Sequence, residues 1–230
     1  MRDGRRCPRS PNRDETTAEQ SELNNRQAQR RLMRLINCNF DGRRGDIFLT
    51  LTHRGETTEE DARKGARDFL KRLRAERKKR GLEELKYIII TECQSGRWHH
   101  HLIKNGGIPL EDLKAIWGRG RATVSVLDDT YTYAELAAYL TKRQKPRRGE
   151  TAGNAKQGRP KYGRRWSSSK NLRKPEVTKR EIKPIRRVTA PKPPKGYRLL
   201  PDWYIGADMW GHIYMHFECV RETEGVGKRE

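Results

Sequence analysis

The stretch from residue 87 to residue 104 constrains the fold more than any other part of the chain. It reads YIIITECQSGRWHHHLIK, with a β-branched run before Ser95–Gly96 and a second run that ends in Leu-Ile. Two such runs separated by two turn-forming residues are typical of an antiparallel hairpin with a tight loop. The sequence therefore predicts two paired strands, at about 85–92 and 98–104.

A two-residue loop at Ser95–Gly96 determines which side chains lie opposite each other in the hairpin. In this register Glu92 lies opposite His99. Alternation along the strand then puts His99 and His101 on the face of Glu92, and His100 on the other face. Two imidazoles and one carboxylate leave coordination positions open for water or substrate, as in catalytic metal sites. We therefore expect Glu92, His99 and His101 to bind a metal ion.

A simpler interpretation of the three consecutive histidines is a solvated strand edge, or a cluster that binds metal without a function. A slip of one residue in the register would also move Glu92 to the wrong face. The opposed glutamate and the basic chain around it favour the functional interpretation.

The charge of the chain indicates its partner. Its 230 residues include 52 Lys and Arg against 30 Asp and Glu, a net charge of +22, and only 33% are hydrophobic. A charge this positive predicts a polyanionic partner, most simply nucleic acid. A basic membrane-surface protein is disfavoured because no long basic helix carries bulky apolar residues, and no apolar run approaches the ~20 residues of a membrane span.

The four cysteines, Cys7, Cys38, Cys93 and Cys219, are far apart and have no paired spacing. We expect free thiols in a reducing cytoplasm, and neither a disulfide nor a zinc framework. The N-terminus lacks the apolar core of a signal peptide, which agrees with a cytoplasmic location.

The remaining elements predict the fold class. We expect helices at 15–36, 58–80, 109–117 and 132–143, and further strands at 46–52 and 121–127. The order from 46 onward matches the βαββαβ pattern of ferredoxin-like and RRM-like folds. We therefore predict an α+β fold with a central antiparallel sheet, helices on one face, and the other face left for substrate.

Four segments differ in composition, and we interpret them as an N-terminal arm and helix (1–45), a core (46–145), a basic segment (146–196) and a C-terminal hairpin with a tail (197–230). The basic segment has 17 Lys or Arg against three acidic residues and little periodic apolarity. It is either a solvated disordered segment or an arm that orders on nucleic acid. We expect Trp166 to stack on a base. The residues predicted to contact DNA are Arg97, Arg143, Lys145, Arg147, Arg148, Arg164, Arg165, Trp166, Lys170 and Arg173.

Tyr139 is the candidate nucleophile. It lies three residues before Lys142, so both side chains share one face of the predicted helix at 132–143. A phenol attacks a phosphodiester only when a cation stabilises its phenolate, and Lys142 offers that charge. Tyr139 is equally compatible with a packing role beside Leu136 and Leu140.

Glu92, the run Gly96 to Leu102 and Tyr139-x-x-Lys142 together resemble the HUH endonucleases, and more narrowly the rolling-circle replication initiators of filamentous phages and small plasmids. The resemblance covers roughly residues 45 to 220. It implies His99, His101 and Glu92 as ligands of Mg²⁺ or Mn²⁺, Tyr139 as nucleophile and Lys142 as its support.

The resemblance also implies nicking and religation of single-stranded or hairpin origin DNA through a 5′-phosphotyrosine. A host helicase and polymerase would be further partners, because the chain has no P-loop motif. The sequence departs from the family pattern at His100, where an apolar residue is usual. It also has Glu135 and Arg143 where some initiators carry a second tyrosine, which predicts a single-tyrosine enzyme.

Two other classes share parts of this pattern. A single-tyrosine transposase or relaxase has a similar metal motif, although a relaxase usually has three clustered histidines. A non-catalytic nucleic-acid-binding module with an RRM-like sheet would carry aromatic residues on its central strands, where this chain has His and Glu. Metal-dependent cleavage separates an enzyme from a binding module.

Overall fold

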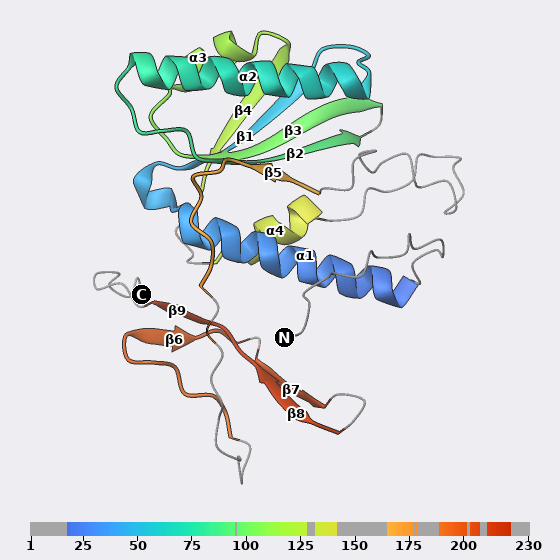
Figure 1. The fold of residues 1–230 in the computed structure, drawn as a ribbon, viewed down its shortest axis with the longest axis vertical. Coiled ribbons are helices and arrows are strands. Elements are labelled where there is room, and N and C mark those ends of the chain that lie inside the picture. Colours follow the sequence, from blue (N-terminus) through green and yellow to red (C-terminus); the bar gives the residue numbers. More distant parts are fainter. Residues whose placement is uncertain are drawn as a thin grey trace, which may run out of the picture.

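A five-stranded antiparallel sheet forms the centre of the molecule (Figure 1). The computed structural model describes residues 18–94, 96–127, 132–141, 165–176, 178, 189–201, 203–207 and 211–221. The strand order is β4-β1-β3-β2-β5, so β3 is central and the β2–β3 hairpin lies inside the sheet. The strands are β1 (Ile47–His53), β2 (Tyr87–Gln94), β3 (Arg97–Lys104), β4 (Gly120–Val126) and β5 (Ser167–Ser168). The predicted α+β fold with a central antiparallel sheet is confirmed.

The first four strands lie where the sequence predicts them, whereas β5 was not expected. Its two residues pair with the outer edge of β2, with Ser167 opposite Ile89 and Ser168 opposite Ile88. The bond from the Tyr87 amide to the Ser169 hydroxyl continues this contact. A segment of the predicted basic arm therefore belongs to the sheet.

Four α-helices and one short 3₁₀ helix accompany the sheet. Thr58 caps α2 by accepting a hydrogen bond from the Asp61 amide, as the sequence predicts for Thr57 or Thr58. The helices are α1 (Ala18–Asn39), α2 (Glu59–Lys79), α3 (Leu110–Trp117), α4 (Ala134–Thr141) and the 3₁₀ helix η1 (Gly42–Arg44).

Helices α2 and α3 cover one face of the sheet. The side chains on this face come from alternate strand residues, such as Leu49 and Leu51 of β1 and Leu102 of β3. They pack against Phe69 of α2 and Trp117 of α3, both fully buried. This is the helical layer that the βαββαβ order predicts.

The other sheet face is more covered than the expected arrangement, which placed helices on one face. Helices α1 and α4 lie along it (Figure 1). Ile36 of α1 and Leu140 of α4 pack there with Ile88 and Ile103. The physical reason is the apolar end of α1, which loses contact with water only by packing on this face. The substrate face is therefore limited to the part of the sheet beside α1 and α4.

The C-terminal strands form two further ribbons beyond α1 (Figure 1). β7 (Tyr204–Ala207) pairs with β8 (Ile213–His216), which confirms the predicted hairpin, and β6 (Tyr197–Leu199) pairs with β9 (Cys219–Arg221). Arg30 of α1 donates a hydrogen bond to the Tyr204 hydroxyl at 3.1 Å.

Two predictions from composition agree with the described residues. Cys38, Cys93 and Cys219 are free thiols there, and Cys7 lies outside the described residues. Within the same part of the chain, no helix combines the length and the apolarity needed to cross a membrane.

Candidate metal and nucleophile site

The β2–β3 hairpin has the predicted register. Glu92 pairs with His99, Ile90 pairs with His101, and Gln94 pairs with Arg97 at the turn. Gly96 has a φ of 80°, a left-handed conformation that L side chains rarely adopt, so a glycine suits this turn. The hairpin therefore places Glu92, His99 and His101 on the same sheet face.

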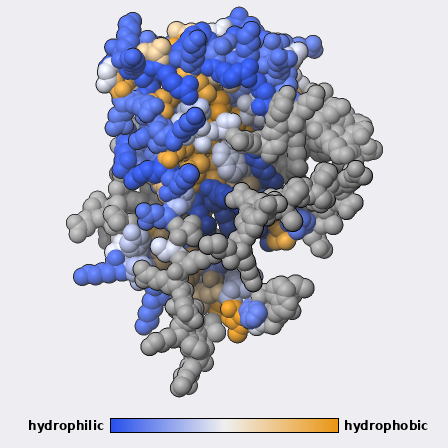
Figure 2. Space-filling model, viewed as in Figure 1, coloured by the Kyte–Doolittle hydropathy of each residue, from blue (hydrophilic) through white to orange (hydrophobic). Residues whose placement is uncertain are grey.

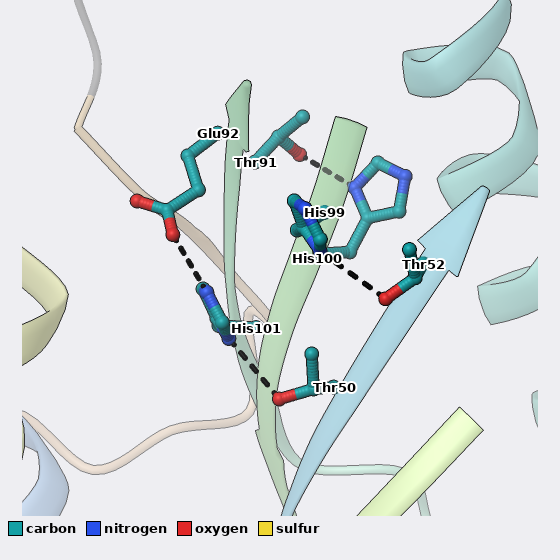
Figure 3. A network of polar contacts seen from close by, with 7 residues as sticks. All are labelled: Thr50, Thr52, Thr91, Glu92, His99, His100 and His101. Atoms are coloured by element: carbon teal, nitrogen blue, oxygen red, sulfur yellow. Dashed lines mark hydrogen bonds and ion pairs between the residues drawn. The ribbon is translucent and has the colours of Figure 1, made fainter. Parts of the chain in front are cut away.

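Glu92 and His101 form a close buried pair on that face. Oε1 of Glu92 lies 2.8 Å from Nε2 of His101, and the two side chains are 9% and 7% exposed. Figure 3 shows them pointing toward each other from neighbouring strands, while the His100 ring projects from the opposite face. A carboxylate and an imidazole at this distance share a proton or a cation.

Two threonines of β1 orient the two histidines through the other ring nitrogen. The Thr50 hydroxyl lies 3.2 Å from Nδ1 of His101, and the Thr52 hydroxyl lies 3.1 Å from Nδ1 of His99 (Figure 3). Hydrogen bonds at Nδ1 are the usual outer contacts of metal-binding histidines, because they set the ring orientation and tautomer. The sequence analysis missed both threonines, because the β1–β3 pairing joins strands that are distant in the chain.

The donor set suits a divalent cation. If Nδ1–H of His101 donates to Thr50, its Nε2 carries a lone pair that faces the Glu92 carboxylate at 2.8 Å. Two acceptors at that distance require a positive charge between them, which a metal ion supplies. In the other tautomer, Nε2–H donates to Glu92 and Nδ1 accepts from Thr50. The residues thus fit a metal ion in one tautomer and a hydrogen-bonded pair in the other.

His99 completes the predicted set in position, although it does not close on the pair. In the described ranges, no three or more His, Cys, Asp or Glu side chains are grouped so that they would hold a metal ion. Burial lowers the pKa of His99, and the nearby His101 lowers it further, whereas Glu92 opposes the shift. A lowered pKa keeps the His99 imidazole neutral near pH 7, and the neutral form is the one that binds metals.

Tyr139 of α4 lies directly against the buried pair. Its ring centroid is 5.6 Å from that of His101, and the two rings meet edge to face. Tyr139 is 43% exposed, whereas Leu140 beside it is 7% exposed and packs in the core. The helix therefore uses Leu140 for packing and presents Tyr139 at the surface beside the candidate metal ligands.

His100 belongs to a separate buried cluster on the α2–α3 face. Its Nε2 lies 3.0 Å from Nε2 of His53, its Nδ1 lies 2.9 Å from the Thr91 hydroxyl, and Trp117 packs against both imidazoles. Burial lowers the pKa of His100 to about 3, and the nearby His53 contributes. His100 is therefore a neutral core residue, and the sequence analysis did not foresee its partner His53.

The residues predicted to contact DNA are divided by the limits of the description. Arg97 and Lys170 are exposed, and Arg165 and Trp166 are half-buried. Arg173 anchors its segment to the end of α1, because its guanidinium donates to the Cys38 carbonyl at 2.7 Å. The others lie outside the described residues, as does the predicted support of the nucleophile, namely Lys142, Arg143, Lys145, Arg147, Arg148 and Arg164.

A family model described as replication-associated protein ORF2 matches residues 46–144. This region runs from β1 to the end of α4, so it contains Glu92, His99, His101 and Tyr139. The match supports a role in replication initiation, with DNA as the partner. Neither the comparison with curated proteins nor that with solved structures gave a match.

Proposed function

We propose that this chain is a rolling-circle replication initiator that nicks and rejoins single-stranded origin DNA through a covalent bond to Tyr139. The observation that carries the proposal is the contact between the exposed Tyr139 ring and His101, which is paired with Glu92. The family match over residues 46–144 supports the same role, because it includes the whole of this site.

Glu92, His99 and His101 would hold a divalent ion, Mg²⁺ or Mn²⁺. Bound there, the ion would polarise the scissile phosphate and neutralise the charge that develops on it. Thr50 and Thr52 keep the histidine rings in place through Nδ1. A ring held in this way needs no rearrangement when the phosphate arrives, which lowers the cost of reaching the transition state.

The covalent step uses the phenol of Tyr139. Its Oη attacks the phosphorus in line and loses its proton to water. The bond between phosphorus and the 3′ oxygen breaks, and that oxygen takes up a proton to become a free 3′-hydroxyl. The product is a 5′-phosphotyrosine, and a later attack by a 3′-hydroxyl reseals the strand and regenerates the phenol. No ATP is needed, because the phosphotyrosine keeps the energy of the broken phosphodiester.

Transfer of a 3′ label from DNA to protein tests this proposal. Single-stranded DNA from the region flanking the chain's own gene is incubated with the full chain and Mn²⁺, with and without EDTA, and run on a denaturing gel. We expect a labelled protein band that requires the metal and is absent in Tyr139→Phe. Labelled protein in Tyr139→Phe, or tight binding of this DNA without any adduct, would refute the proposal.

Tyr133→Phe is the matched control, since it makes the same chemical change at a buried site. Tyr133 is 7% exposed and its hydroxyl accepts a hydrogen bond from the Gly42 amide at 3.2 Å. Loss of that bond costs about 1 kcal/mol of stability. The adduct should therefore still form in this variant.

A further inference from the structure

A cavity lies between α1 and the residues that precede β5, outside the region that the family model matches. Its volume is about 420 Å³, within the range of roughly 300 to 1,000 Å³ that is usual for small-molecule sites. The residues that line it are Asn24, Gln27, Ala28, Arg31, Arg165 and Trp166.

The walls of this cavity combine the groups that bind a nucleotide. Trp166 offers an aromatic surface, and it is half-buried because it packs against the second core cluster. Arg31 and Arg165 bring two positive charges, and the Arg165 guanidinium is held by the side-chain oxygen of Asn25. The side-chain amide of Gln27 can donate to and accept from the edge of a base. An indole beside guanidinium groups is a common way to bind an unpaired base and its phosphate.

The strand pairing relates the cavity to the candidate metal site. Ser167 of β5 lies opposite Ile89 of β2, so Trp166 follows at the level of Ile90. Trp166 and Ile90 belong to the same core cluster, on the sheet face that also carries Glu92 two residues further along β2. A single strand that lies on this face can therefore reach both places.

The hydropathy of the surface agrees with this placement. Figure 2 shows mainly hydrophilic residues over α2, and hydrophobic residues exposed below them at the level of the sheet. Unpaired bases have apolar faces that stack on such surfaces, whereas a phosphate backbone does not.

We propose that the cavity holds one unstacked base of the bound single strand against Trp166, with an adjoining phosphate contacted by Arg31 and Arg165. The proposal deepens the proposed function and rests on it for the identity of the strand. It adds a base-binding position beside the nicking site, and this position would set where the scissile phosphate lies along the strand.

Photocrosslinking with the unaltered full chain tests the base position directly. The probe is a thymidine oligonucleotide in which single 5-iodouracils replace thymine, irradiated in EDTA so that no cleavage occurs. We expect a crosslinked peptide that contains Trp166, and its yield should fall when unlabelled single-stranded DNA is added in excess. Crosslinks that map elsewhere with none at Trp166 would overturn the proposal.

Binding measurements on variants test the two contacts separately. Trp166→Ala should weaken binding of the thymidine oligonucleotide about 5- to 100-fold, the range for loss of one stacked base. Trp166→Phe should keep most of the affinity, which distinguishes stacking from loss of the fold. Equal losses in the two variants would contradict a stacking role.

Arg31→Ala should weaken binding about tenfold, as expected for one charged hydrogen bond to phosphate. Arg34→Ala is the matched control, because Arg34 is an exposed residue of the same helix outside the cavity lining. Equal losses in these two variants would show that only general charge attraction operates, and would overturn the proposal.

These outcomes are separable from those of the nicking test. A chain that crosslinks at Trp166 but forms no adduct keeps the cavity proposal and loses the proposed function. A chain that forms an adduct at Tyr139 without crosslinking at Trp166 does the reverse.

Discussion

The two faces of β3 use neighbouring histidines in opposite ways. On one face, His101 lies 2.8 Å from the Glu92 carboxylate and touches the exposed ring of Tyr139. On the other face, His100 is fully buried, with another histidine, His53, as its partner at 3.0 Å. The same side chain therefore meets a negative charge on one face and a dry, uncharged core on the other.

This difference shows that the position of a residue in the sheet determines its role more than its place in the HHH run. A carboxylate beside an imidazole favours a bound cation or proton, whereas burial without a charged partner favours the neutral ring. The mutations below test this contrast, from the largest expected effect to the smallest.

His101→Ala should abolish metal-dependent nicking and weaken Mn²⁺ binding by more than about 100-fold, because loss of an outer contact alone costs about 10- to 100-fold. The variant also leaves the buried Glu92 carboxylate without its partner. Calorimetric titration with Mn²⁺ and the 3′-label assay measure the two effects. Unchanged Mn²⁺ affinity would show that His101 is not a ligand.

Lys104→Met should stabilise the protein near neutral pH. Lys104 lies on the His100 face, is fully buried, and its Nζ has no hydrogen-bond partner among the described residues. Burial lowers the pKa of Lys104 to about 8 from its ordinary 10.5, so at pH 7 the native state holds an unfavourable charge. The gap corresponds to a gain on the order of 3 kcal/mol for the variant.

The pH dependence of this gain has a definite sign. Between pH 8 and 10.5 the unfolded chain binds more protons at Lys104 than the native state does, so the stability of the natural chain rises with pH. The advantage of Lys104→Met should therefore shrink across that window. Urea unfolding at pH 7 and pH 10 measures it, and an equal advantage at both pH values would be inconsistent with a buried charged lysine.

His100→Asn should destabilise the fold by about 2 kcal/mol, because it leaves the buried His53 nitrogen without its partner. Mn²⁺ affinity of the folded protein should stay close to that of the natural chain. Urea unfolding and calorimetric titration give the two quantities. A loss of Mn²⁺ affinity as large as in His101→Ala would remove the contrast between the two faces.

Thr50→Val should lower Mn²⁺ affinity about tenfold, because the isosteric side chain no longer fixes Nδ1 of His101. Thr123 of β4, the residue opposite Thr50, supplies a matched Thr→Val control on the same sheet. We expect a change below about twofold for Thr123→Val, within the usual range for substitutions that leave no ligand unsupported. The same loss in both variants would argue against a specific role for Thr50.

The local part of the site was predictable from the sequence. The Ser95–Gly96 turn and the alternation of side chains were enough to place Glu92 opposite His99, because hairpin register depends on the turn and on nearby residues. The α+β class followed in the same way from the order of periodic segments.

Contacts between distant segments were not predictable. Thr50 and Thr52 alternate visibly along β1, but their pairing with β3 depends on the order of strands in the folded sheet. β5 is only Ser167–Ser168, too short for any periodic signal. The position of α1 on the second face also depends on tertiary packing, which overrides the simple expectation of helices on one face.

The most direct test of the central claim is to identify the amino acid that carries DNA after reaction with Mn²⁺. The adduct is digested with trypsin and nuclease, and the nucleotide-bearing peptide is sequenced by mass spectrometry. The account predicts a single modified residue, Tyr139, on the peptide from α4. A nucleotide on another residue would contradict the assignment of Tyr139 as the nucleophile.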